Sequence, residues 1–244
     1  IFYFILPNER NDISHCVTNY LIHYWKYTMQ PILELNNISK SFFGKAIYQS
    51  LSLNLEKGCH ALVGKNGSGK SVLIEMLAGV SIPDTGNIQL RGVGYANSLS
   101  YKEKLTYIPS SPIFFPTATG CDFLNFIMAV KKSHNDHENI ENLINCFKLS
   151  DHLETEFTNM SLGTQKKLFL ATLAFEKSKL IILDEPTNSL DAESSNILYE
   201  IIRKLSQDKI VIIATHDDHL LNEITPTVMT LNKHPITHLI KNNR

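Results

Sequence analysis

The sequence has 244 residues, 43% of them hydrophobic and 19% charged, which is enough for one α/β domain with a core. This composition excludes a disordered chain, a collagen-like repeat and a coiled coil. Lys and Arg number 23 against 24 Asp and Glu, a net charge of −1, so no global basic field indicates nucleic acid or a membrane surface. The longest apolar runs are far shorter than the ~20 residues that span a bilayer, so a membrane role would depend on a partner.

The first 28 residues mix aromatic, Asn and His residues without a sustained period of 2 or 3.6. They do not have the order of a secretory signal, because the apolar stretch comes first and no small-residue cleavage site follows. We interpret residues 29–244 as the folded domain and residues 1–28 as a poorly ordered extension or an upstream reading-frame artefact. The alternative is a docked N-terminal segment, since aromatic side chains such as Trp25 and Tyr27 are costly to expose.

The cysteines are scattered, with no CxxC pair and no histidines at metal-ligand spacing: Cys16, Cys59, Cys121 and Cys146. This pattern is typical of reduced thiols in a cytosolic protein and does not favour a disulfide or zinc framework.

From Met29 onward the apolar pattern is regular. It predicts strands at Ile32–Asn36, Leu51–Leu55, His60–Val63, Asn87–Leu90, Leu105–Ile108, Leu180–Leu183, Ile210–Ala214 and Val228–Asn232. It predicts helices at Lys70–Ala78, Asp191–Leu205 and Asp217–Glu223. Between about residues 119 and 177 no strand is expected, and helical spacing occurs at Asp122–Val130, Asn139–Phe147 and Thr164–Glu176. The unbroken apolar runs suit a parallel sheet covered on both faces, so we expect a mixed α/β core with an all-helical insertion.

A phosphate-binding loop follows the third predicted strand. The residues that fit the pattern G-x-x-x-x-G-K-[ST] are Gly64, Lys65, Asn66, Gly67, Ser68, Gly69, Lys70 and Ser71. The glycines allow successive backbone N–H groups to point at phosphates, and the N-terminus of the following helix adds partial positive charge. We expect Lys70 to contact phosphate oxygens and the Ser71 hydroxyl to be a Mg²⁺ ligand. The alternative is a glycine-rich turn without a ligand.

Two carboxylates end the run Leu180–Leu183, namely Asp184 and Glu185. The carboxyl ends of parallel strands face the same crevice, so these side chains should lie near the phosphate-binding loop. We assign Asp184 to Mg²⁺ and Glu185 to the general base that takes a proton from the attacking water. The alternative is a surface loop after a core strand.

These motifs resemble the nucleotide-binding domain of ATP-binding cassette (ABC) transporters, over about residues 30–241. Phe42 stands where the family stacks an aromatic ring on adenine, with Phe43 as a rival shifted by one residue. The other family motifs follow in order: Tyr107 to Ser110 at the Q-loop, Met160 to Gln165 at the signature sequence, Leu183 to Asp191 across the Walker B strand and D-loop, and Ala214 to Asp217 at the switch loop. The signature and D-loop separate this family from other P-loop proteins.

The resemblance implies a P-loop NTPase core, mainly a parallel sheet flanked by helices, with an antiparallel β lobe and an inserted α-helical subdomain at about 119–177. It also implies two domains that face each other head to tail, with each ATP between one phosphate-binding loop and the other domain's signature helix. The Ser161 hydroxyl, the Gly163 backbone N–H and the N-terminus of helix Thr164–Glu176 would contact the γ-phosphate from across this interface, and Gln165 is counted among the nucleotide-binding residues. His216 would hydrogen-bond the γ-phosphate and hold Glu185 and the water.

Two positions depart from the family pattern. Ser110 stands where the family has a glutamine that reaches Mg²⁺, and its hydroxyl could reach the metal through a water. We expect slower or differently coupled hydrolysis with ATP binding largely intact, and unchanged turnover of the assembled complex on Ser110→Gln would contradict this. Leu162 stands where the family keeps glycine, which we take as a tolerable variant.

The resemblance implies an ATP-hydrolysing subunit of a transporter, with ATP and Mg²⁺ as cofactors. Its expected partners are a second cassette (homo- or heterodimer) and a separate transmembrane permease, with no nucleic acid. We therefore expect a cytoplasmic protein held on the inner face of the membrane. The permease would dock on the helical insertion near Phe114, Phe115, Phe123 and Phe126, although at least half of this cluster should be subdomain core. The alternatives are a soluble ABC-type ATPase of translation or DNA repair, and a nucleotide-gated module impaired in hydrolysis.

Overall fold

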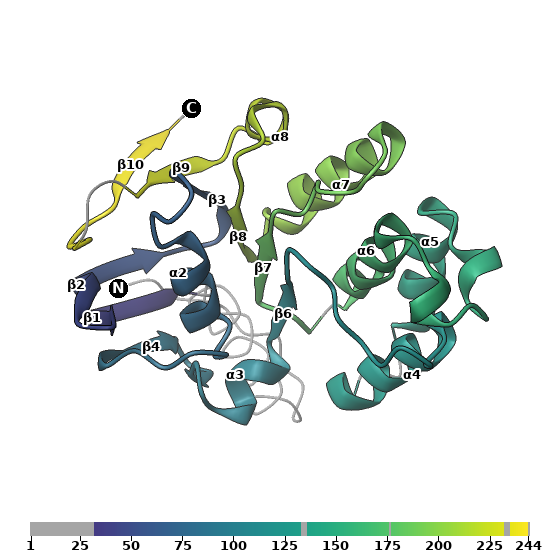
Figure 1. The fold of residues 1–244 in the computed structure, drawn as a ribbon, viewed down its shortest axis with the longest axis horizontal. Coiled ribbons are helices and arrows are strands. Elements are labelled where there is room, and N and C mark those ends of the chain that lie inside the picture. Colours follow the sequence, from purple (N-terminus) through teal and green to yellow (C-terminus); the bar gives the residue numbers. More distant parts are fainter. Residues whose placement is uncertain (1–31, 133–135, 176, 232–234, 244) are drawn as a thin grey trace, which may run out of the picture. The chain divides into compact units, whose positions relative to one another are not determined.

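The computed structural model describes residues 32–132, 136–175, 177–231 and 235–243, which belong to a single unit that runs from Pro31 to Arg244. The segment interpreted above as an N-terminal extension lies outside the described residues. Two sheets and the helices around them make up the described unit (Figure 1). The predicted α/β class is therefore confirmed.

The smaller sheet is antiparallel, with strand order β2-β1-β4-β5. Its strands are β1 (Leu33–Phe42), β2 (Lys45–Leu55), β4 (Thr85–Leu90) and β5 (Gly94–Tyr95). The sequence predicted only the first half of β1, as Ile32–Asn36, and the last half of β2, as Leu51–Leu55. Register shifts between the two strands after Leu35 and Ile38 break the alternation on which that prediction depended.

The larger sheet has the order β10-β9-β3-β8-β7-β6. Its strands are β3 (Gly58–Val63), β6 (Leu105–Ile108), β7 (Leu180–Asp184), β8 (Ile210–Ala214), β9 (Thr227–Thr230) and β10 (Ile240–Asn243). All neighbouring pairs are parallel except β10 with β9. The sequence predicted one strand after His216, Val228–Asn232, whereas the structure has two, β9 and β10. β10 was missed because a polar edge strand has no apolar pattern.

Alternate side chains of the central strands enter two different hydrophobic clusters. Ile182 and Ile212 pack with α2 (Lys70–Leu77) and the antiparallel sheet, whereas Ile181 and Ile213 pack with the helices on the opposite face. Because both faces are covered, β7 and β8 are buried along their whole length. This burial explains the unbroken apolar runs of the sequence.

The helical insertion follows β6 and contains α4 (Gly120–Lys131), α5 (His137–Cys146) and α6 (Leu162–Ala171), gathered beyond the β6 edge in Figure 1. Within the described part of residues 119–177 there is no strand, as predicted. The last predicted helix is wrong at its end: α6 stops at Ala171 and a 3₁₀ turn, η3 (Thr172–Ala174), follows. The Thr172 hydroxyl donates to the Phe169 carbonyl there, which competes with regular helix hydrogen bonding.

The remaining helices are α3 (Leu99–Glu103), α7 (Ala192–Leu205) and α8 (Asp218–Ile224). Over the described ranges, none of the helices combines the length and apolarity that crossing a bilayer would require. Cys59, Cys121 and Cys146 are free thiols, and Cys16 lies outside the described residues.

Candidate functional site

Four parallel strands end at the same edge of the larger sheet. The register pairs Leu62 of β3 and Asp184 of β7 with the same residue of β8, Ala214, and pairs Ile108 of β6 with Leu183 of β7. The segments that follow these strands therefore start side by side. They are the predicted phosphate-binding loop, Q-loop, Walker B carboxylates and switch loop, so the fold brings together motifs that lie far apart in the sequence.

The phosphate-binding loop connects β3 to α2, as the motif requires. Gly67 and Gly69 have positive φ angles, 76° and 97°, which L side chains rarely adopt. Behind the loop, the buried Tyr48 hydroxyl donates a 2.9 Å hydrogen bond to the Gly69 carbonyl. A Cβ on Gly69 would lie 3.0 Å from a methyl group of Ile47 and 3.1 Å from the Tyr48 hydroxyl. The curled form of the loop thus requires glycine at these positions, and the Tyr48 hydrogen bond holds it in place.

The polar side chains of this loop differ in their surroundings. The Lys70 ammonium donates to the carbonyls of Gly64 (2.6 Å) and Lys65 (3.4 Å). Ser71, Lys65 and Asn66 are exposed. Ser68 is buried, and its Oγ has no hydrogen-bond partner among the described residues.

The two carboxylates after β7 lie in different environments. Asp184 is only 9% exposed, and its pKa is raised, chiefly by burial and then by the charge of Glu185. A hydrogen bond from Ser110 and the positive charges of Lys166 and Lys70 act in the opposite direction. Asp184 therefore lies within electrostatic reach of Lys70, the predicted phosphate-binding lysine, and of Ser110 at the Q-loop position.

Glu185 has a positive φ of 42°, a strained backbone conformation for a residue with a side chain. One carboxylate oxygen, Oε1, lies 2.8 Å from Nδ1 of the exposed His216. The other oxygen, Oε2, is buried and has no hydrogen-bond partner in the described part of the chain. The predicted base and the predicted switch histidine are thus in direct contact.

These features fit a nucleoside triphosphate with a divalent cation. Buried polar atoms are normally hydrogen-bonded, so Ser68 Oγ and Glu185 Oε2 point to polar ligand atoms or water. The glycine cradle suits phosphate oxygens. Mg²⁺ usually binds through substrate phosphates and only one or two protein oxygens. The carboxylate of Asp184 and the hydroxyl of Ser71 would supply such oxygens beside the phosphates.

Replacing Asp184 with asparagine should raise the melting temperature of the nucleotide-free protein at pH 7, and should raise it less at acid pH. A carboxylate with a raised native pKa lowers stability at pH values where it is ionised, and this penalty fades as the pH falls through that pKa. Calorimetry at pH 7 and at acid pH would measure the gain and its decrease. A lower melting temperature at pH 7 would contradict the prediction.

The signature sequence forms the start of α6. Ser161 caps this helix, its Oγ accepting a hydrogen bond from the Thr164 backbone at 3.1 Å. Leu162 is 65% exposed. Gln165 donates through its amide to the carbonyls of Phe157 (2.8 Å) and Met160 (3.4 Å), so its side chain supports the loop before the helix. Donation from Gln165 to a phosphate would require its amide nitrogen to leave these carbonyls.

Gly163→Ala should weaken ATP-dependent self-association of the chain while leaving nucleotide binding by its own phosphate-binding loop within about 3-fold. A Cβ at Gly163 would lie 2.6 Å from the Ser189 carbonyl, so the D-loop or the start of α6 must shift. Analytical ultracentrifugation with ATP, and titration with a fluorescent nucleotide, would separate the two effects. Equal self-association of the variant and the parent chain would count against it.

The aromatic residues predicted to contact adenine lie at the β1–β2 turn. Phe42 is partly exposed, and the Lys40 ammonium lies 5.5 Å from its ring centroid. Phe43 is fully exposed and has a positive φ of 48° within the turn. Both rings are accessible to a nucleotide base.

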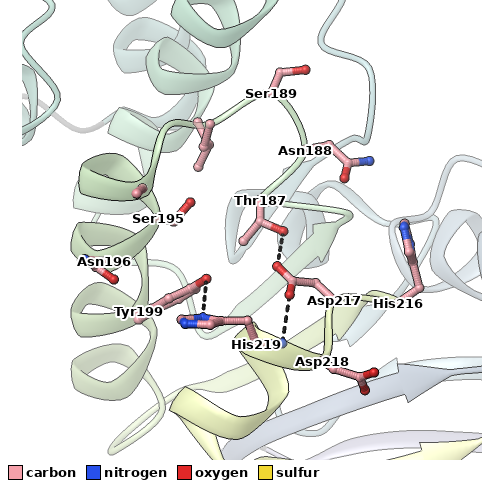
Figure 2. Close-up of a pocket in the computed structure, with 12 residues that line it drawn as sticks. Thr187, Asn188, Ser189, Ser195, Asn196, Tyr199, His216, Asp217, Asp218 and His219 are labelled. Carbon is pink, nitrogen blue, oxygen red and sulfur yellow. Dashed lines mark hydrogen bonds between the residues drawn. The ribbon is translucent and has the colours of Figure 1, made fainter.

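An open depression of about 880 Å³ lies beside the D-loop and the switch loop. Figure 2 shows the Thr187 hydroxyl and the His219 backbone directed at the Asp217 carboxylate, at 2.8 and 2.9 Å. This carboxylate also caps α8 and so fixes the segment that follows His216. The D-loop and the switch loop are therefore tied to each other.

Two residues near the site were not anticipated from the sequence. Tyr48 gives no signal, because an aromatic residue in a strand is ordinary core. Lys166 is only 1% exposed, and burial lowers the pKa of its ammonium to about 8. The sequence could have revealed this burial, because Lys166 stands four residues before Leu170 and therefore lies on the same, inward face of the helix.

Comparisons with known proteins agree with the motifs found at the sheet edge. The family model described as "ABC transporter" matches residues 48–188. The lipoprotein-releasing system ATP-binding protein LolD of Buchnera aphidicola is 31% identical over 229 residues, covering 87% of this chain and 96% of LolD.

Two solved structures have the same fold. The ATP-binding subunit of an ABC transporter has a TM-score of 0.79 at 21% identity, covering 87% of this chain and 90% of its own. A dimeric ATP-binding cassette in a post-hydrolysis state, bound to ADP and Pi, has a TM-score of 0.73 at 17% identity, covering 86% and 98%. The family match, the relative and the fold agree with the motifs assembled at the sheet edge: this chain belongs to the ABC transporter family, and it is an ATP-binding ATPase.

Proposed function

We propose that this ATPase is the energising subunit of a transporter and drives a substrate through a separate membrane partner by ATP-dependent dimerisation. The observation that carries the proposal is the assembly, at one sheet edge, of the glycine-rich loop, the carboxylates Asp184 and Glu185, and His216. The signature helix and D-loop on the same chain add the parts that a second cassette would need. LolD and the similar solved subunit support this reading through their own descriptions as ATP-binding subunits.

In this proposal the nucleotide phosphates lie in the loop of residues 64–71. The backbone N–H groups and the α2 N-terminus supply partial positive charge, and Lys70 leaves the loop carbonyls to contact the phosphates. Ser71 and Asp184 would hold Mg²⁺, and the Ser110 hydroxyl, which hydrogen-bonds Asp184, would support that carboxylate. The ion, when bound, neutralises charge on the phosphate oxygens. Phe42 or Phe43 stacks on the adenine.

Hydrolysis requires a group that accepts the proton of the attacking water. Glu185 is suited to this role, because its Oε2 is buried and without a partner in the described structure while Oε1 is held 2.8 Å from His216. His216 fixes the carboxylate and, being exposed, can also donate to the γ-phosphate. The positive φ of Glu185 fits a side chain held in a fixed direction.

Dimerisation would bring the signature of one chain to the nucleotide of another. The exposed Ser161 hydroxyl, the half-buried Gly163 backbone and the N-terminus of α6 form a group of donors suited to a γ-phosphate. The similar solved cassette is itself a dimer. Loss of the γ-phosphate on hydrolysis removes the charge that these donors bind, so the two chains can separate.

The membrane partner would dock on the helical insertion. Phe123 is buried and Phe114 packs against Phe115, Phe123 and Phe126, which makes half of the predicted aromatic cluster subdomain core. Phe115 and Phe126 remain exposed, and both rings contact Phe114, so they offer apolar surface for a partner. Such a protein would be cytoplasmic and held at the membrane by its partner, without contacting nucleic acid.

The test is purification of the full chain with the membrane protein encoded beside it, which should have about six apolar spans of 20 residues. We expect the two proteins to remain together in detergent, and the partner to stimulate ATP turnover in lipid vesicles. Phe115→Ser with Phe126→Ser should weaken this association while preserving turnover of the isolated chain. Recovery of the native chain with ribosomes, and not with membranes, would favour the translation-type alternative.

A further inference from the structure

A buried lysine lies directly beneath the site and has no role in the mechanism proposed above. Lys166 belongs to α6, five residues after the capping Ser161, and its side chain points into the protein. Burying a charged group is costly unless it is fully hydrogen-bonded, so a lysine that is 1% exposed calls for a specific reason. Its hydrogen bonds supply one.

The Lys166 ammonium donates to three backbone carbonyls in two separate segments, the loop after β6 and the end of β7. It lies 2.7 Å from the carbonyl of Pro109, 3.4 Å from that of Ser110 and 3.3 Å from that of Asp184. An ammonium has three N–H donors and accepts none, so these three carbonyls match its capacity. One side chain thus joins the signature helix to the end of β6 and to the end of β7.

Two of these carbonyls belong to residues whose side chains lie in the site, Ser110 and Asp184. Ser110 hydrogen-bonds the Asp184 carboxylate, and the backbone of Asp184 leads directly to the strained Glu185. At the other end, the helix that carries Lys166 begins with Ser161 and Gly163. A displacement of α6 would therefore be transmitted through Lys166 to the carboxylates, and the reverse.

We propose that Lys166 is a positioning residue that couples the signature helix to the Asp184–Glu185 side of the same chain's ATP site. The proposal rests on the proposed function, because it takes the signature helix to be the part that meets the second chain's nucleotide. The coupling has a physical basis in the three carbonyl contacts, which hold the Q-loop serine and the Walker B end at a fixed distance from α6.

The experiment compares Lys166→Met with Lys131→Met in the purified full chain. Lys131 is a matched control, since its ammonium also donates to backbone carbonyls, those of Lys102 and Leu105, at the opposite end of β6 from Ser110. For Lys166→Met we expect kcat to fall about 10- to 100-fold with KM within about 3-fold, the pattern of a misplaced reacting group. Lys131→Met should keep the parental kcat.

Dimerisation gives a second readout that a merely structural role would not change. In a Glu185→Gln background, Lys166→Met should raise the ATP concentration needed for half-maximal dimer about 10-fold, while the affinity of the monomer for a fluorescent ATP analogue stays within about 3-fold. Lys166→Gln, whose amide retains two donors, should lie between the parent and Lys166→Met in both assays.

Each result decides the proposal. Equal losses of kcat in Lys166→Met and Lys131→Met, or parental kcat and dimerisation in Lys166→Met, would overturn it. If Lys166→Met does not fold, Lys166→Gln is measured alone, and parental values there would overturn the proposal as well. Failure of the Glu185→Gln chain to bind ATP and dimerise would instead contradict the proposed function, independently of Lys166.

Discussion

Replacing Glu185 with glutamine is expected to lower ATP turnover by about 10²- to 10⁴-fold, the usual contribution of a general base. Glutamine has nearly the same shape and can keep the hydrogen bond to His216, but its amide does not take a proton from water. Nucleotide affinity should stay within about 3-fold, because no part of the phosphate-binding loop changes. Single-turnover kinetics with radiolabelled ATP would measure the chemical step directly.

The same variant should accumulate as an ATP-bound dimer, because the γ-phosphate is no longer removed. Size-exclusion chromatography with ATP and Mg²⁺ would detect this species, and ADP in place of ATP would provide the contrast. Glu223→Gln is a suitable control, since Glu223 lies on α8 in an exposed ion pair with Arg203. A fall in turnover of less than 10-fold would show that another group accepts the proton.

The parts of the site predicted from the sequence were those encoded by short contiguous motifs. A glycine-rich loop between an apolar strand and a helix has one favourable geometry, and the structure has it at residues 64–71. The contact between Glu185 and His216 was implied by the family resemblance, and it forms because neighbouring parallel strands end at one edge of the sheet. The loop was therefore predicted from local sequence, and the contact from the resemblance.

Features that depend on tertiary packing were not predictable in this way. β1 extends to Phe42 across register shifts that remove the period of 2. β10 is an edge strand of polar sequence, and its pairing with β9 compensates for weak strand propensity. Tyr48 and Lys166 act through hydrogen bonds to carbonyls 21 and 18 to 57 residues away in sequence, distances at which no periodicity carries information.

The structure also changes how two signature residues are understood. The resemblance predicted direct nucleotide contacts for Ser161 and Gln165. Ser161 already accepts the Thr164 amide as a helix cap, and Gln165 already donates to the loop before the helix. The Ser161 hydroxyl also lies 2.9 Å from the Thr164 hydroxyl, and the Gln165 amide is held at two carbonyls. Both side chains are therefore already hydrogen-bonded within their own chain, and donation across a dimer would require an exchange of partners.

Replacing Lys70 with methionine is expected to weaken ATP binding about 100-fold, the value of a hydrogen bond between charged groups in a partly buried site. Methionine keeps the length and most of the volume of the side chain, so the loss isolates the charge. Two opposing effects decide the magnitude. The ammonium gives up its contacts with the Gly64 and Lys65 carbonyls on binding, which reduces the net gain, but it then faces several phosphate oxygens at once.

Isothermal titration calorimetry with ATP and with ADP would separate the phosphates that Lys70 contacts. A larger loss for ATP than for ADP indicates a contact with the γ-phosphate, and equal losses place the ammonium at the β-phosphate. Lys57→Met, an exposed lysine in the turn before β3, should bind both nucleotides like the parent chain. Melting temperatures of the nucleotide-free variants give the remaining control, because Lys70→Met leaves the Gly64 carbonyl without its ammonium donor. If Lys70→Met retained parental affinity with an unchanged melting temperature, the loop would bind phosphate through its backbone alone, and the positive charge at position 70 would serve the loop rather than the nucleotide.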